Sequence, residues 1–284
     1  MTSRRNLVTV VGYAVLSFAL IAGLWYVVIW VFNLKPFVMP TPVASVRALW
    51  DARSTLAQDA SITVKETMLG FGAGATFGFI SAVLMAQSRH LQRLFYPPLI
   101  TSQAVPVVAI APPLVILLGF GLTSKIVIVA WIVFFPVLVS VLDGLVSIDR
   151  DMLNLARIMN GSKGRTFFVI KLPAAIGPMF SGLKIGATYA VTGAVIGEWT
   201  ASTGQGLGPY IQSADAALDT AAVYGATMLL TALGVSGFLC VLGLERLATP
   251  WKYRGTARKL SIRRSDDVRS SSLDRRVHRE AGVM

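Results

Sequence analysis

Side chains that could support acid–base or metal chemistry are few and scattered in this sequence. Its 284 residues hold two histidines, His90 and His278, and one cysteine, Cys240. A single cysteine can form neither an intramolecular disulfide nor a multi-cysteine zinc site. Two distant histidines indicate neither a metal pair nor a Ser–His arrangement. The sequence therefore predicts no catalytic residue and no metal site in this chain.

Ionisable side chains inside long apolar stretches are the next candidates, and they are Lys65, Glu66, Asp143, Lys184 and Glu198. A charge at the centre of a bilayer costs at least a few kcal/mol, so each position needs a partner, a route to the interface or a function. We expect Lys65, Glu66 and Asp143 to reach the interface from a helix end. Lys184 lies deeper, unless its helix begins later in the chain.

Four residues are candidates for lining a polar pathway. Glu198 and Trp199 close an apolar block beside a glycine-rich segment, where Glu198 either lines the outer mouth of a pathway or is an ordinary interface carboxylate. Ser102 and Gln103 lie early in a block that prolines interrupt between 106 and 113. Broken helices free backbone groups that only protein or a water-filled cavity can satisfy.

The composition is that of a membrane protein. Hydrophobic residues make up 54% of the chain and charged residues 14%, against roughly 25% charged in a soluble domain. The net charge of +12 does not indicate a nucleic-acid partner, because ten of the 26 basic residues lie in the segment 252–284. That basic, apolar-poor tail, 251–284, is expected to be disordered, and it acts as an orientation signal or as a patch for anionic lipid.

Six apolar blocks predict six membrane-spanning helices, since each supplies the ~20 residues that cross a hydrocarbon core of ~30 Å. The predicted crossings are 7–32, 63–87, 96–119, 123–146, 174–199 and 222–246. A short interfacial helix is expected over Val43 to Trp50. Glycines at four-residue spacing, in the runs 70–78 and 182–190, predict close helix packing, within one subunit rather than at a dimer seam.

Charge placement orients these crossings. The segments 88–95 and 147–172 and the tail carry most of the Lys and Arg residues between blocks, whereas 200–221 carry none. Positive residues accumulate on the cytoplasmic side, so both termini are expected in the cytoplasm.

The loop 147–172 is the most informative segment. Its apolar spacing predicts a helix over Asp149 to Met159, and Asn160-Gly161 then ends that helix as a pair tolerant of the left-handed region. Pro173 lies where the next crossing begins, a position at which its missing N–H costs little. This cytoplasmic helix–turn–helix would act as a lever on two crossings.

The loop resembles the signature of binding-protein-dependent ABC importer permeases, which reads Glu-Ala-Ala, three residues, Gly, nine residues, Ile, one residue, Leu-Pro. Ile170 and Leu172-Pro173 match, whereas Asn154, Leu155 and Asn160 stand at the Glu, first Ala and Gly positions. Gly161 is expected to take over the turn one position later. The strings GFGLTSK (119–125) and GAVIGEW (193–199) are similar to the sulfonate, taurine, nitrate and thiamine-precursor branch, most of all to pyrimidine-precursor or riboflavin-type permeases.

The resemblance implies an all-α, type I importer-like permease in the bacterial inner membrane, with a cytoplasmic coupling helix between the fourth and fifth crossings. It also implies a permease homodimer, two cytoplasmic ATPase subunits that bind ATP and Mg, and a periplasmic or lipid-anchored solute-binding protein. The chain itself lacks the GxxxxGK[ST] phosphate loop. The residues implied in ATPase coupling are Leu153, Asn154, Ala156, Arg157, Asn160 and Gly161.

Two other classes of membrane protein fit the sequence less well. A membrane enzyme would need clustered His, Asp or Glu at membrane depth, and a secondary transporter commonly has mid-membrane acidic residues and internal repeats. Neither pattern is convincing in this sequence. Among importers, a pyrimidine precursor of thiamine or a related heterocycle is favoured over sulfonate, taurine or nitrate.

Overall fold

The computed structural model of the chain describes residues 2–201 and 203–250, and every element in these ranges is a helix. The basic tail predicted at 251–284 lies outside them. Four helices are long and apolar enough to cross a membrane: α3 (Arg53–Gln87), α6 (Leu122–Val146), the continuous helix Gly164–Thr200 that contains α9 (Leu172–Thr200), and α11 (Thr220–Ala248). The predicted all-α membrane fold is confirmed.

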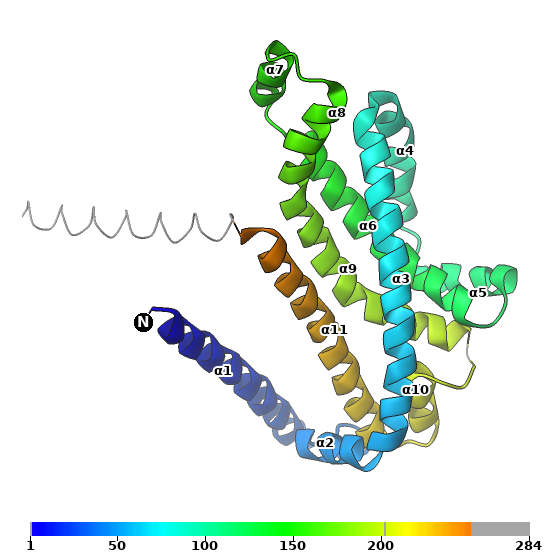
Figure 1. Cartoon of the computed structure of the whole chain (residues 1–284). Helices are drawn as coiled ribbons and strands as arrows, with labels where there is room; N and C mark the ends of the chain where they lie inside the picture. Colours follow the sequence, from blue (N-terminus) through cyan, green and yellow to red (C-terminus); the bar gives the residue numbers. More distant parts are fainter. Residues whose placement is uncertain (1, 202, 251–284) are drawn as a thin grey trace, which may run out of the picture.

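Most of the N-terminal helix α1 (Thr2–Val31) stands apart from the bundle (Figure 1). Its C-terminal part contacts α2 (Pro42–Asp51), and the ring of Trp25 lies 5.4 Å from that of Tyr224 in α11. Thr41 caps α2, because its side-chain oxygen accepts a hydrogen bond of 3.2 Å from the N–H of Ala44. The short helix predicted at 43–50 is therefore present. The described part of α1 contains one apolar stretch, Ala19–Val31, so the first of the six crossings stays a prediction.

The third predicted crossing, 96–119, is not one straight helix. It consists of α4 (Arg89–Ser102) and α5 (Val107–Leu118), which meet at an angle of 101°. Pro106 accounts for the break, because it lacks an N–H and disfavours helical geometry at the residue before it. The prolines at 112 and 113 lie inside α5 and do not end it.

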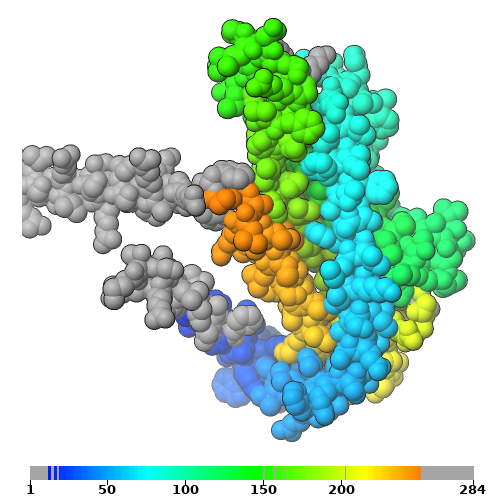
Figure 2. All heavy atoms as spheres, in the orientation of Figure 1, coloured from blue at the N-terminus to red at the C-terminus, as the bar shows by residue number. Residues whose placement is uncertain are grey.

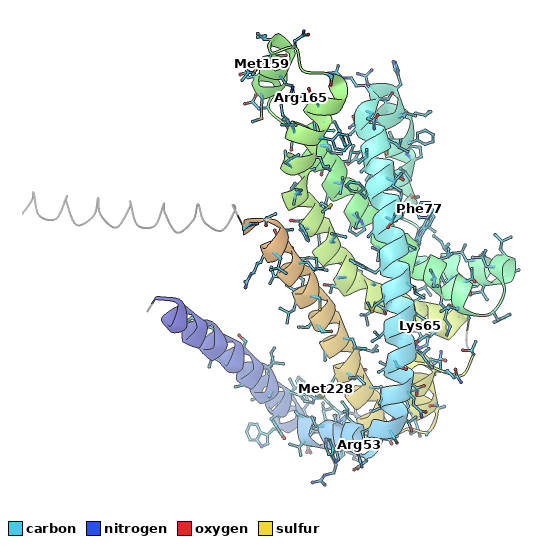
Figure 3. All side chains as sticks on the ribbon, viewed as in Figure 1. Arg53, Lys65, Phe77, Met159, Arg165 and Met228 are labelled. Atoms are coloured by element: carbon cyan, nitrogen blue, oxygen red, sulfur yellow. The ribbon has the colours of Figure 1, made fainter. Side chains whose placement is uncertain are left out.

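The bundle has two ends, which we name by their short helices (Figure 1). The α7 end carries α7 (Arg150–Ile158) and α8 (Lys163–Thr166), and the α10 end carries α2 and α10 (Leu207–Ala216). Figure 3 shows Met159 at the extreme of the α7 end and Arg53 near the other extreme.

Helix α6 is the centre of the bundle, and its most extensive contacts are with α3 and α9. Gly70, Gly74 and Gly78 of α3 lie against α6, and a Cβ at Gly74 would come within 2.5 Å of the carbonyl oxygen of Ala130. Gly182 of α9 also approaches α6 closely, and a Cβ there would lie 2.6 Å from the carbonyl oxygen of Pro136. The glycine runs therefore pack within one subunit, as predicted, and they bring backbones into contact where lipid provides no hydrophobic drive.

We expect Gly74→Ala to destabilise the bundle by about 1–3 kcal/mol, because the added methyl group overlaps the α6 backbone. Gly72, two residues away, has no heavy atom within 4 Å of the equivalent position. Gly72→Ala should therefore be neutral, or gain the roughly 1 kcal/mol by which alanine exceeds glycine in a helix. Thermal unfolding midpoints of the two purified variants in detergent measure the difference. Equal midpoints would contradict the close packing of α3 on α6.

Candidate functional site

The α7 end carries a short helix closed by a defined turn. The side chain of Asp149 accepts a hydrogen bond of 2.9 Å from the N–H of Asp151 at the start of α7. At the other end Asn160 has φ +57°, and the N–H of Gly161 donates to the carbonyl oxygen of Ala156 at 2.9 Å. A bond spanning five residues around a left-handed residue is that of a Schellman motif. The predicted helix and its stop are both present.

The expectation that Gly161 takes over the turn is wrong. Asn160 itself adopts the positive φ, because its short polar side chain tolerates the left-handed region better than most residues do. Gly161 is needed for a different reason, since a Cβ there would lie 2.8 Å from the carbonyl oxygen of Ala156.

An exposed apolar surface covers α7. Met152, Leu155, Ile158 and Met159 are all more than half exposed, with Ile158 at 82%. Their positions lie within two turns of one helix, so the surface is continuous. A contiguous apolar surface of this kind marks an interaction site.

The residues predicted for coupling lie on and around this helix. Leu153 and Ala156 are partly buried, and Asn154 and Asn160 are exposed. Gly161 is partly buried within the turn. The side chain of Arg157 is outside what the structure describes. All six residues belong to α7 or to its closing turn.

A rigid connection joins this surface to the membrane. The chain from Gly164 to Thr200 is a single helix of 37 residues, in which a π-helical turn, Phe167–Lys171, links α8 to α9. Ser162 begins it by accepting a hydrogen bond of 3.2 Å from the N–H of Arg165. Figure 2 shows α7 and α8 standing out at one end of the molecule. The turn 159–162 is the one short break between α7 and this helix, so a force on α7 reaches α9 across that turn.

The halves of α3 and α6 nearer the α10 end are joined by a buried ion pair. The ammonium of Lys125 lies 2.8 Å from Oε1 of Glu66, and the two side chains are 2% and 3% exposed. The expectation that Glu66 reaches the interface is wrong, whereas the neighbouring Lys65 is exposed (Figure 3). The signal that could have found the pair was the placement of opposite charges near the same end of two neighbouring crossings.

Glu198 is fully buried and ties α9 to the loop that follows it. Oε1 accepts a hydrogen bond of 2.6 Å from the hydroxyl of Thr63, and Oε2 accepts one of 2.6 Å from the N–H of Gly208. The oxygen of Thr63 in turn accepts from the N–H of Leu207 at 3.0 Å. Thr63 was not among the predicted site residues, since a lone threonine in an apolar block carries no distinctive signal.

Glycine is required in this loop because the loop runs directly over the carboxylate. Gly206 has φ +111°, and its N–H donates to Oδ1 of Asp59 at 3.0 Å. A Cβ at Gly208 would lie 2.8 Å from Oε2 of Glu198. We name Asp59, Thr63 and Glu198 with the segment 206–208 the outer clasp.

The other predicted pathway residues occupy two places. Trp199 is 46% exposed and donates from its indole N–H to the carbonyl oxygen of Gly208, beside the outer clasp. Ser102 and Gln103 lie at the break between α4 and α5, where Gln103 is exposed and the hydroxyl of Ser102 donates to the carbonyl oxygen of Leu99. A role in a pathway stays a prediction for all four residues.

Comparison with known proteins decides the family. Residues 74–251, more than half of the chain, match the family described as binding-protein-dependent transport system inner membrane component. The chain belongs to this family. It is therefore the membrane-embedded permease component of an ABC importer for small solutes, and the family implies an ATPase partner and a solute-binding protein.

Three relatives of the permease span most of its length. A probable ABC transporter permease protein of Haemophilus influenzae is 36% identical, over 75% of this chain and 86% of its own. The formylaminopyrimidine transport permease protein of Halalkalibacterium halodurans is 29% identical, over 77% and 87%. The riboflavin transport system permease protein of Chloroflexus aurantiacus is 31% identical, over 76% and 81%. The resemblance to pyrimidine-precursor and riboflavin-type permeases is thereby confirmed.

The backbone at Asn160 explains how the permease keeps the turn after α7 although its signature lacks the usual glycine. The glycine position of the signature is occupied by Asn160, which adopts the left-handed conformation that a glycine would adopt. The departure is therefore conservative in backbone geometry.

Lys125→Met should destabilise the permease strongly, by about 3–5 kcal/mol, because it leaves the carboxylate of Glu66 buried without its partner. The double variant Lys125→Met/Glu66→Leu should recover most of that loss, since both charges are removed from the interior. Lys65→Met serves as the control at an exposed lysine of α3, next to Glu66. Unfolding midpoints of the four proteins measure the effects, and no recovery in the double variant would argue against a simple buried pair.

Proposed function

We propose that two copies of this permease form the translocation pathway of an ABC importer for a small nitrogen heterocycle. A pyrimidine precursor of thiamine or a related heterocycle is the first candidate. The observation that carries the mechanism is the exposed apolar surface of α7, which the short turn 159–162 connects to the continuous helix Gly164–Thr200 that contains α9.

In this proposal α7 docks on a cytoplasmic ATPase subunit, which binds ATP and Mg. Closure of the ATPases moves α7, and the continuous helix carries that movement to α9 and to α6 packed against it. The α7 end then faces the cytoplasm together with both termini, and the α10 end faces the binding protein. Basic residues in the segment 147–172 support this orientation in the bacterial inner membrane.

The break between α4 and α5 is the second part of the proposal. Ser102 and the exposed Gln103 lie where backbone groups leave the helical pattern, and alternating-access sites are often built at broken helices. In this proposal Ser102 and Gln103 face the pathway. The large exposed apolar side chains of α3, such as Phe77 and Leu84, face lipid.

The solute assignment rests on the named relatives, which are permeases for formylaminopyrimidine and riboflavin. Sulfonate, taurine or nitrate is the alternative, and a secondary transporter is a more remote one. Genes beside this one would separate these readings, because thiamine-synthesis neighbours favour the pyrimidine and desulfonation enzymes favour a sulfonate.

Proteoliposomes that hold the permease with its adjacent ATPase and binding protein should take up labelled formylaminopyrimidine only when ATP is supplied. Taurine is the parallel probe. Uptake of taurine alone would overturn the heterocycle assignment and leave the importer standing. Uptake driven by a proton gradient without ATP would overturn the importer.

Ile158→Glu should abolish co-purification of the ATPase with the permease, because a carboxylate would be buried in an apolar contact. Ile158 is 82% exposed, so the change should not disturb folding of the permease itself. Phe37→Glu, at an exposed apolar residue of the opposite end, is the matched control and should retain the ATPase. Undiminished ATPase yield from the Ile158 variant would refute α7 as the docking surface.

A further inference from the structure

A groove of about 370 Å³ lies between α9 and α11, on a part of α9 that α6 does not cover. Four threonines line it, two from each helix: Thr188 and Thr192 of α9, and Thr227 and Thr231 of α11. The remaining lining residues are aliphatic or glycine. The volume is within the range of small-molecule sites, which are mostly apolar with a few convergent polar groups.

The threonines distinguish this groove from the part of the chain that suits lipid. The exposed residues of α3 are mainly large and apolar, among them Met68, Phe77 and Leu84. The exposed positions of the groove are the four threonines and Val235, and the threonines recur one turn apart on each of two facing helices. Four hydroxyls around one groove suit a polar occupant better than they suit a lipid acyl chain.

Three of the four hydroxyls donate their proton to the backbone of their own helix. Thr188 donates to the carbonyl oxygen of Lys184, Thr227 to that of Val223 and Thr231 to that of Thr227, at 2.8–3.1 Å. A hydroxyl has one proton and two lone pairs, so these three oxygens can still accept hydrogen bonds. The groove is thus suited to a solute that carries N–H donors.

The groove lacks a free positive charge that would hold an acidic solute. None of its lining residues is ionisable. Lys184 lies one turn before Thr188, but its ammonium is paired with Oε2 of Glu245 at 2.8 Å. A sulfonate has only acceptor oxygens and a negative charge, and it would meet no cation here, while three of the four hydroxyl protons are already donated to the helix backbone.

We propose that this threonine groove is a solute-contact site of the pathway, selective for neutral heterocycles with N–H groups over sulfonates. The inference rests on the proposed importer function and deepens it, since it moves part of the selectivity from the binding protein into the permease. The second permease copy closes the open side of the groove.

Cysteine labelling tests whether the groove is aqueous. In a Cys240→Ala background, Thr192→Cys in the assembled importer should react with a membrane-impermeant maleimide, and formylaminopyrimidine should slow that reaction. Thr76→Cys is the control, because Thr76 is an exposed threonine of α3 with the same hydrogen bond to its own helix. Equal lack of labelling at both positions would place lipid in the groove and overturn the proposal. Disulfide formation between two copies through Thr192→Cys, without labelling, would make it a subunit seam and also overturn it.

Transport tests the selectivity. Thr192→Val and Thr231→Val should each slow ATP-dependent uptake of formylaminopyrimidine by about fivefold, the value of one hydrogen bond, with ATPase docking unchanged. Thr76→Val should have no effect. If the wild-type complex and the groove variants transport formylaminopyrimidine equally well, the groove is not a solute-contact site, and the proposed importer function is unaffected. If the wild-type complex transports neither formylaminopyrimidine nor taurine with ATP, the importer function itself fails.

Discussion

The close approach of three helix backbones is the constraint on which this structure depends. Helix α6 lies between glycine faces of α3 and α9, and at Gly74 and Gly182 no side chain larger than hydrogen fits without displacing the α6 backbone. Lipid provides no hydrophobic drive for helix association, so such contacts must hold the bundle together through packing. The three helices behave as one rigid body, and the elements at both ends of the permease are attached to it.

Polar groups reinforce that rigid body where packing alone is insufficient. The pair Lys125–Glu66 joins α6 to α3, and the pair Lys184–Glu245 joins α9 to α11. The outer clasp fastens the α10 end to α3 and α9 through Glu198 and Thr63. Each charged side chain inside the bundle that the sequence singled out at depth has a partner, because an unpaired charge there would be too costly. These contacts fix α3, α6, α9 and α11 relative to one another.

Much of the permease could be predicted from its sequence. Long apolar blocks locate the spanning helices because a bilayer demands ~20 apolar residues for each crossing. The helix at 150–158 and its stop follow from local rules, since apolar spacing and an Asn-Gly pair act within a few residues. The glycine runs predicted close packing within the subunit for the same reason: their periodicity is a property of a single helix.

The partners of the buried polar groups were decided only by the tertiary structure. Glu66 lies 59 positions from Lys125, and Thr63 lies 135 from Glu198, so no local pattern could join them. The threonine groove likewise depends on how α9 and α11 meet. The ordering of apolar and polar residues along the chain determined that this protein spans a membrane and how helix α7 begins and ends. The meeting of distant helices decided which side chains are buried, paired or exposed, because those contacts join residues far apart in the chain.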